Sequence, residues 1–264
     1  MQHSPRRRFG QNFLIDRGVI ADIVGAIAPS RDDLMVEIGP GLGALTDPLL
    51  RILDRLHVIE IDRDLVTNLA RMHPPERLIV HAGDALEFDF AMLGSGLRLV
   101  GNLPYNISTP LLFHVARFGS IVRDTHFMLQ KEVVDRMVAT AGSGDVGRLS
   151  IMLQYRFAME KLIDVPPDAF DPAPKVTSAL VRMLPLDPLP HPARDERLFA
   201  QLVTRAFTQR RKTLRNALAT YLTAAELATI DIDPGARAET LDVASWVRAA
   251  DCVVARELRQ PFSG

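Results

Sequence analysis

A short polar and aromatic group directly follows the apolar run Leu97–Val100, and it consists of Asn102, Leu103, Pro104 and Tyr105. The side-chain oxygen of Asn102 and the main-chain carbonyl of Leu103 are two acceptors that together can bind both hydrogens of an exocyclic amine. Pro104 restricts the backbone that aims them, and Tyr105 offers a ring on which a base can stack. These residues predict a site for an amino group on a planar base, although a plain turn with an Asn cap and a core Tyr would use the same residues.

A glycine-rich turn lies in the stretch "MVEIGPGLGALT" at Met35–Thr46, which reads as a strand, a turn and the start of a helix. Gly39, Gly41 and Gly43 allow a ligand to approach the backbone closely, and the following helix offers unpaired N–H groups. The spacing G-x-G-x-G differs from the dinucleotide form G-x-G-x-x-G, because Ala44 occupies the last position. The turn alone is a weak indication of a ligand, since a turn that serves only packing can have the same glycines.

Two acidic positions follow the next two expected strands. Glu60 ends the strand in "HVIEID", about 20 residues after the glycines, where a carboxylate can accept both hydroxyls of a ribose. Spacing alone leaves Asp62 as an equal alternative. Asp84, in "HAGDAL", follows the third strand, and open sheets bind ligands at this carboxyl edge where the strand order reverses. Glycines and acids together therefore predict a nucleoside-containing cofactor.

Short apolar strands alternate with helix-like segments across the first two-thirds of the chain. Amphipathic stretches such as Leu45–Leu53 and Leu65–Arg71 stand between the early strands. This alternation predicts an α/β fold with a doubly wound, Rossmann-like parallel sheet and helices on both faces. The expected strands are Leu34–Ile38, Leu56–Ile61, Arg77–His81, Leu97–Val100, Thr125–Gln130, Lys161–Val165 and Ser178–Leu184.

A proline-rich segment, "PLDPLPHP" at Pro185–Pro192, reads as a linker. Beyond it, apolar residues recur at helical spacing and no strand pattern returns. We therefore expect a sheet-containing domain at residues 1–184, opening with a basic arm at residues 1–17. A small all-helical domain is expected at residues 193–264.

Composition matches an ordinary soluble globular protein, with 47% hydrophobic and 24% charged residues in 264. The single cysteine, Cys252, excludes an internal disulfide framework and a cysteine-rich metal site. The seven histidines contain no His-x-x-x-His pair, so no metal is expected. No apolar stretch approaches the roughly 20 residues of a membrane helix, and we expect a cytoplasmic protein without a membrane partner.

Positive charge is concentrated in two places although the net charge is only −1. Residues 1–17 hold four arginines against one aspartate, and residues 194–215 hold seven basic residues against two acids. The two segments carry +3 and +5, so the remainder totals −9. Two basic islands on an acidic body predict an anionic partner that binds at defined places.

Seven motifs together resemble the small-subunit ribosomal RNA adenine dimethyltransferases, the KsgA/RsmA family. The resemblance implies an enzyme that transfers methyl groups from S-adenosylmethionine to the N6 amines of two adjacent adenosines. Its implied substrate is a hairpin near the 3′ end of 16S rRNA within a pre-30S particle, and a monomer is expected. The motifs are "QNFL", "EIGPGLGALT", "GNLPYNISTP", "FMLQKEVVDR", "GRLS", "PPDAFDPAPKVTSA" and "FTQRRKTLRN".

The resemblance also implies roles for individual residues. It favours Glu60 over Asp62 and assigns Asp84 to the adenine of the cofactor. It makes Phe170 a second ring for the target base, beside Tyr105; the alternative is that Phe170 anchors its loop on the core. The expected cofactor contacts are Gln11, Asn12, Leu14, Gly39, Gly41, Glu60, Asp84, Ala85 and Asn102.

The basic motif "FTQRRKTLRN" is expected to be a helix that binds RNA phosphates. At helical spacing Lys212 and Arg205 share one face, while Arg211 and Arg215 share a neighbouring face. Phe207, Leu214 and Leu218 would take the core side. The expected RNA contacts are Arg6, Arg7, Arg8, Arg205, Arg210, Arg211, Lys212 and Arg215.

Three other functions compete with this interpretation. A large-subunit rRNA adenine methyltransferase of the antibiotic-resistance type is disfavoured by the motifs at Phe127–Arg136 and Phe207–Asn216. A non-catalytic RNA-binding assembly factor would have no use for the intact Asn102–Tyr105 group. A nicotinamide oxidoreductase is disfavoured by the glycine spacing and by the lack of a recognisable catalytic His or Tyr-Lys pair.

Overall fold

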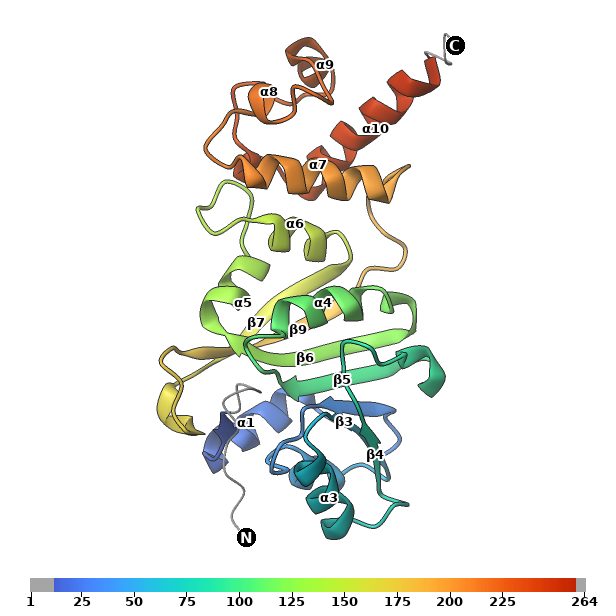
Figure 1. The fold of residues 1–264 in the computed structure, drawn as a ribbon, viewed down its shortest axis with the longest axis vertical. Coiled ribbons are helices and arrows are strands. Elements are labelled where there is room, and N and C mark those ends of the chain that lie inside the picture. Colours follow the sequence, from blue (N-terminus) through green and yellow to red (C-terminus); the bar gives the residue numbers. More distant parts are fainter. Residues whose placement is uncertain (1–11, 260–264) are drawn as a thin grey trace. The chain divides into compact units, whose positions relative to one another are not determined.

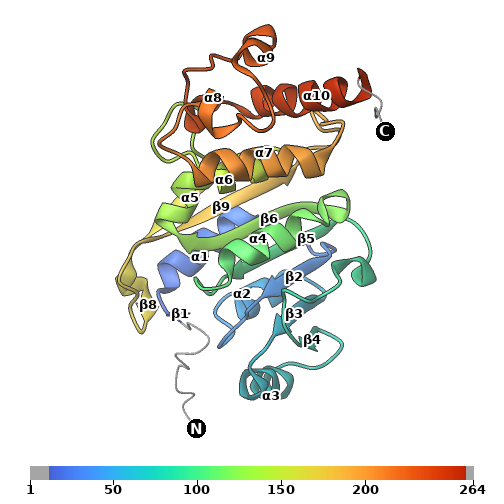
Figure 2. The same cartoon turned by 45° about the horizontal axis from the view of Figure 1, so that its top comes forward.

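The computed structural model describes residues 12–259 and divides the chain into two compact units (Figures 1 and 2). The first unit comprises the chain up to Val134 together with Ala158–Pro185, and the second comprises Asp135–Phe157 together with the chain from Leu186 onward. The division after Pro185 falls within the proline-rich segment. The structure differs in assigning 135–157 to the second unit, because side chains of this segment are buried in the core of the C-terminal helices.

The first unit is built on a seven-stranded sheet with the order β4-β3-β2-β5-β6-β9-β7, which confirms the predicted α/β class. Most of these strands are labelled in Figure 1, and β2 is labelled in Figure 2. The five strands from β4 to β6 run parallel, and β9 pairs antiparallel with β6. The strand order reverses between β2 and β5. The strands are β2 Met35–Ile38, β3 Leu56–Glu60, β4 Leu78–Ala82, β5 Leu97–Asn102, β6 Val122–Gln130, β7 Phe157–Val165 and β9 Ser178–Pro185.

Helices of the first unit begin at side-chain caps that the sequence supplies. The carboxylate of Asp16 accepts a hydrogen bond from the Val19 N–H at the start of α1, and Asp62 does the same for Asp64 N–H at α3. One buried cluster joins α1 and α2 to alternate strand residues, so this face of the sheet is closed to water. The helices are α1 Arg17–Ile27, α2 Thr46–Leu50, α3 Arg63–Met72 and α4 Ser108–Ala116, with short 3-10 turns η2 Phe90–Leu93, η3 Gly119–Ile121 and η4 Pro167–Ala169.

A second, two-stranded sheet joins β1 (Phe13–Leu14) to β8 (Phe170–Asp171), and the sequence analysis did not predict it. The register pairs Leu14 with Phe170, and Ile15 N–H donates to the Ala169 carbonyl at 2.9 Å. Two-residue strands are too short to show a hydrophobic period. The pairing holds Phe13–Leu14 beside Phe170–Asp171, more than 150 residues later in the chain.

The second unit is helical, as predicted for its C-terminal part. Trp246, Phe199 and Leu202 are fully buried at its centre. Its helices are α6 Arg148–Gln154, α7 Glu196–Thr208, α8 Leu214–Ala217, α9 Ala224–Thr229 and α10 Val243–Arg259, with η5 at Ala238–Thr240, and α5 Lys131–Met137 spans the division between the units.

The basic motif is not one helix, so the predicted helical faces of Arg205, Lys212, Arg211 and Arg215 are wrong. Helix α7 ends at Thr208, residues 209–213 form a turn, and α8 starts at Leu214. The N–H groups of Leu214 and Arg215 donate to the carbonyls of Ala236 and Pro234 at 2.8 and 3.1 Å. Because these donors bond to a distant segment, the helix does not continue through the motif.

No helix within residues 12–259 combines the length and apolar character needed to cross a bilayer.

Candidate active site at the carboxyl edge of the sheet

A cavity opens at the carboxyl ends of β2, β3 and β5, where the strand order reverses, and it encloses about 1110 Å³ of empty space, part of it open to solvent. This is the place that doubly wound sheets use for ligands. The cavity brings together most of the residues predicted from the sequence. They are Asn12, Leu14, Gly39, Gly41, Glu60, Asp84, Ala85, Asn102, Leu103, Pro104 and Tyr105.

The glycine-rich turn forms one wall of this cavity. Gly39 and Gly41 have φ angles of +68° and +59°, which only glycine adopts at low cost. A Cβ at Gly41 would also lie 3.1 Å from the ring of Phe13. The turn is therefore shaped by backbone conformation and by close contact with β1.

Glu60 is oriented by the backbone around it. Its Oε1 accepts from Asp62 N–H at 2.9 Å, and its Oε2 accepts weakly from Gly41 N–H at 3.4 Å. Burial raises the pKa of this carboxyl, and the two N–H donors oppose that shift. Asp62 is occupied as the N-cap of α3 and does not line the cavity, so the geometry favours Glu60 for a ligand contact.

Asp84 lies in the turn after β4, with Oδ1 accepting from Leu86 N–H at 2.9 Å. Asp84 also lines the cavity. Ala85 beside it is buried and presents a small surface to the same space. Three successive strands thus end in residues of one site.

The amide of Asn102 is held in a defined orientation. Its Nδ2 donates to the main-chain carbonyl of Asn12 at 2.9 Å. A carbonyl can only accept, so the nitrogen must face Asn12 and the side-chain oxygen must face the other way. The oxygen is consequently presented as an acceptor, which is the property that amine binding requires.

Two backbone contacts hold the turn that follows. Leu103 N–H donates to the Met128 carbonyl at 3.1 Å, and Ile107 N–H donates to the Pro104 carbonyl at 3.1 Å. Before the turn, Gly101 has no room for a side chain, because a Cβ there would lie 2.3 Å from the carbonyl oxygen of Ile38. The glycine therefore lets β5 approach β2 closely enough to place Asn102.

The ring of Tyr105 is anchored at its far end. The hydroxyl lies 2.6 Å from Oγ of Ser178, the buried first residue of β9. Burial raises the pKa of the Tyr105 phenol, which keeps it neutral. The ring is thereby fixed at the cavity as a neutral stacking surface.

Phe170 lies on β8, which pairs with β1. Its side chain is 3% exposed, packs in the core with residues of α1 and β1, and is not among the residues that line the cavity. A role for Phe170 as a second ring for the target base stays a prediction.

Glu37 is a cavity residue that the sequence analysis missed. It is the third residue of β2, is 2% exposed and accepts a hydrogen bond from Oγ1 of Thr46 at 2.6 Å. The pKa of Glu37 is raised to about 8, chiefly by burial and also by the nearby Glu60 and Asp47, although the hydrogen bond from Thr46 opposes this shift. A glutamate inside the apolar stretch "MVEI" was the signal that would have identified it.

The charge of the cavity is one-sided. Three acidic residues line it, Glu37, Glu60 and Asp84, and no Arg, Lys or His from residues 12–259 does so. A cavity with acids and no basic side chain suits a ligand that carries positive charge. Metal binding has no comparable support, since the described residues contain no cluster of three or more His, Cys, Asp or Glu with suitable geometry.

The predicted RNA contacts fall into four groups. Arg210 is engaged within the second unit, where its Nη2 donates to the Gly144 carbonyl and its Nε lies 4.0 Å from Glu239 Oε2. Arg205 lies exposed on α7. Arg6, Arg7 and Arg8 lie outside the described residues, as does Gln11. The exposed cation group, which comprises Arg211, Lys212 and Arg215, has no ion pair with any residue of the part that the structure describes.

Comparison with known proteins identifies relatives along nearly the whole chain. The model of the family described as ribosomal RNA adenine dimethylase matches residues 2–254. A protein of Thiobacillus denitrificans named ribosomal RNA small subunit methyltransferase A is 61% identical over 244 residues, covering 92% of this chain and 96% of its own. The protein of the same name from Aromatoleum aromaticum is 58% identical over 258 residues, covering 98% and 97%.

Two solved structures share the fold. A dimethyladenosine transferase from Plasmodium falciparum superimposes with a TM-score of 0.78 at 22% identity, covering 94% of this chain and 98% of its own. The 23S rRNA methyltransferase ErmE superimposes with a TM-score of 0.73 at 24% identity, covering 92% and 100%. At these identities the similarity establishes the fold.

Proposed function

The chain belongs to the ribosomal RNA adenine dimethylase family, and we propose that it uses S-adenosylmethionine as the methyl donor for small-subunit ribosomal RNA. It is an enzyme that methylates adenine in that RNA. We further propose, as the target, the N6 amines of two adjacent adenosines in the hairpin near the 3′ end of 16S rRNA, within a pre-30S particle. A ribosomal RNA substrate favours the cytoplasm as its location.

The cavity fits this donor by its chemistry. S-adenosylmethionine carries a sulfonium, an α-ammonium, a ribose and an adenine. Glu60 offers an oriented carboxylate for the ribose hydroxyls, and Asp84 offers one for the adenine amine. The acidic lining without basic side chains from the described residues suits the two positive charges. Asn12, Leu14, Gly39, Gly41 and Ala85 would form the walls.

The orientation of Asn102 is the single observation that most supports adenine methylation. When bound, the donor supplies an activated methyl group. The adenine amine is a poor nucleophile because its lone pair is delocalised into the ring. Hydrogen bonds from its two protons to Asn102 Oδ1 and the Leu103 carbonyl favour a pyramidal nitrogen whose lone pair is directed outward. Orientation is therefore the main contribution of the protein.

No general base is needed at this site. The N6 nitrogen of adenine becomes cationic when it takes the methyl group, and it then loses a proton readily to water because this restores its conjugation with the ring. The phenol of Tyr105 is neutral and bonded to Ser178, so its role is to stack on the base that has left its RNA helix. The buried position of Phe170 gives no support to a second stacking ring.

The exposed cation group is the best candidate for RNA phosphates. Its three members lie within five consecutive residues, are exposed and have no acidic partner in the described chain. Arg210 has a structural role, because its guanidinium joins two segments of the second unit. We propose that the protein binds the assembling subunit as a monomer through this group and the basic arm.

One experiment tests the function. The protein is incubated with labelled S-adenosylmethionine and with either undermethylated small subunits or large subunits, and the methylated nucleotides are mapped. We expect dimethyladenosine at two adjacent positions of small-subunit RNA, and none with the Asn102→Ala variant. Label in large-subunit RNA would support the antibiotic-resistance type, and binding without label would support an assembly factor.

A further inference from the structure

Glu37 is a buried carboxyl at the wall of the cavity that the proposed reaction does not use. It stands on β2, beside Val58 of β3 and Val100 of β5 in the sheet register. Its one hydrogen bond in the described structure comes from Thr46, the buried first residue of α2. Nothing in the sheet therefore supplies a positive charge to balance it.

The groups facing Glu37 are mostly acidic. Glu60 on β3 and Asp47 on α2 both act on it electrostatically. Oδ1 of Asp47 lies 3.1 Å from Nε2 of His73, at the end of α3. His73, when charged, is therefore paired with Asp47 and not with Glu37. Asp84 is the remaining acid of the cavity, and no basic side chain of the described residues lines it.

We propose that Glu37 is protonated in the ligand-free protein and that it releases this proton when the sulfonium of the donor binds. The inference rests on the proposed S-adenosylmethionine donor and deepens it. One positive charge, the proton, leaves the site as another, the sulfonium, enters. The reaction product has lost that charge, because the S–CH₃ bond breaks and its electron pair stays on sulfur. Glu37 therefore takes a proton back, which weakens the hold on the product.

The direction in which donor affinity changes with pH follows from the pKa of Glu37. Burial raises the pKa of Glu37 to about 8, so the carboxyl carries its proton at pH 7. A cationic ligand favours the ionised form and lowers this pKa. Donor binding at pH 7 then releases close to one proton, and donor affinity rises with pH until about pH 8, by at most about tenfold per pH unit. The product is a neutral thioether at this position, so its binding does not favour the ionised form of Glu37.

Calorimetry of donor and product binding tests this directly. Binding heats are measured at pH 7 in two buffers of different ionisation enthalpy, which gives the number of protons released. The ligands are S-adenosylmethionine and S-adenosylhomocysteine, and the proteins are the wild type, Glu37→Gln and the matched control Glu87→Gln, whose carboxyl is exposed and outside the cavity. The amine of each ligand also titrates, but its contribution cancels when two proteins are compared with one ligand.

We expect the wild type to release about one proton more than Glu37→Gln on binding the donor. The difference should be near zero for the product, and Glu87→Gln should match the wild type. Equal proton release by the wild type and Glu37→Gln would overturn the inference while leaving the donor assignment intact. Failure of both ligands to bind would overturn the donor assignment and, with it, the inference.

A second variant protects the test against misfolding of Glu37→Gln. The Thr46 hydroxyl stabilises the ionised form of Glu37, so Thr46→Val should raise its pKa further. The rise of donor affinity with pH should then level off at a higher pH than in the wild type. The same pH dependence of donor affinity between pH 6 and 9 in the wild type and in Thr46→Val would refute the proposal without use of Glu37→Gln, because the amine of the donor contributes equally to both.

Discussion

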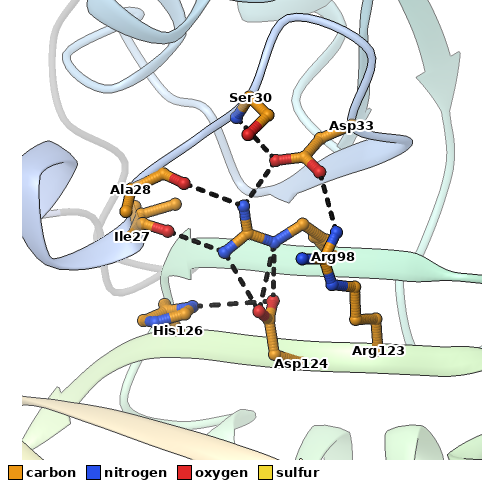
Figure 3. Close-up of polar contacts among 8 residues, drawn as sticks. All are labelled: Ile27, Ala28, Ser30, Asp33, Arg98, Arg123, Asp124 and His126. Atoms are coloured by element: carbon orange, nitrogen blue, oxygen red, sulfur yellow. Dashed lines mark hydrogen bonds and ion pairs between the residues drawn. The ribbon is translucent and has the colours of Figure 1, made fainter.

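Arg98 is the centre of a buried ionic network whose loss should unfold the first unit at a lower temperature (Figure 3). It is the second residue of β5, at the opposite edge of the sheet from the cavity. Its guanidinium pairs with Asp33 at 2.5 Å and with Asp124 at 3.0 Å, and its Nη1 and Nη2 donate to the carbonyls of Ala28 and Ile27. The last two bonds tie the end of α1 to β5.

The expected magnitude follows from burial. The side chains of Arg98, Asp33 and Asp124 are 6%, 5% and 11% exposed. Removing one partner of a buried ionic group costs about 3–5 kcal/mol, because the remaining charges are left uncompensated. Arg98→Met should therefore lower the free energy of unfolding by that amount, and the melting temperature by roughly 6–20 °C.

The network also has a predictable pH response. Burial would raise the pKa of Asp33, but the Ser30 N–H and Arg98 outweigh it and lower the pKa below its ordinary value. A carboxyl with a lowered pKa contributes stability that is present at neutral pH and is lost as the pH falls through its ordinary range. Acid should thus destabilise the wild type more than Arg98→Met.

Thermal and urea unfolding measure these effects. Arg98→Lys keeps the charge but loses the planar guanidinium, so its free energy of unfolding should lie between those of the wild type and Arg98→Met. The matched control is Arg31→Met, which breaks an ion pair with Asp54 whose side chains are 80% and 60% exposed, and which should cost less than about 1 kcal/mol. If Arg98→Met costs no more than Arg31→Met, the network does not stabilise the fold and the reasoning from burial is wrong.

Three further predictions concern the site and the RNA surface. Glu60→Ala should weaken binding of S-adenosylmethionine by about 1.5–3 kcal/mol, the range for hydrogen bonds to a charged group, and unchanged affinity in calorimetry would remove Glu60 from the site. Gly101→Ala should lower the free energy of unfolding by about 1–3 kcal/mol and reduce turnover, because the added Cβ would collide with the backbone of Ile38. Gly25→Ala is the control, since a Cβ at Gly25 has no atom within 4 Å. Replacing the whole exposed cation group by Ala should reduce the slope of log affinity against log salt for small subunits by about 2, with donor affinity unchanged. A wild-type slope would show that the group does not touch RNA.

The sequence by itself determined the class of fold and the edge of the sheet where the site lies. The seven predicted strands all occur. The central strands β2 and β5 are buried along most of their length and are therefore mainly apolar, which the sequence shows directly. Glu60, Asp84 and Asn102 were predicted to meet because parallel strands end at one edge. That inference depends only on strand direction, and the cavity confirms it.

The tertiary structure decided everything that depends on long-range pairing. The Asn12 carbonyl sets the orientation of Asn102 from 90 residues away, and β8 pulls Phe170 into the core by pairing with β1. The basic motif reads as a helix by spacing, yet its backbone donors bond to residues 234–236 and break it into a turn. Glu37 stands out in the sequence as an acid inside an apolar strand, but its raised pKa depends on burial and on neighbouring acids that only the tertiary structure supplies. Hydrophobic period is a property of neighbours in the chain, whereas hydrogen-bond partners and desolvation are set by neighbours in space.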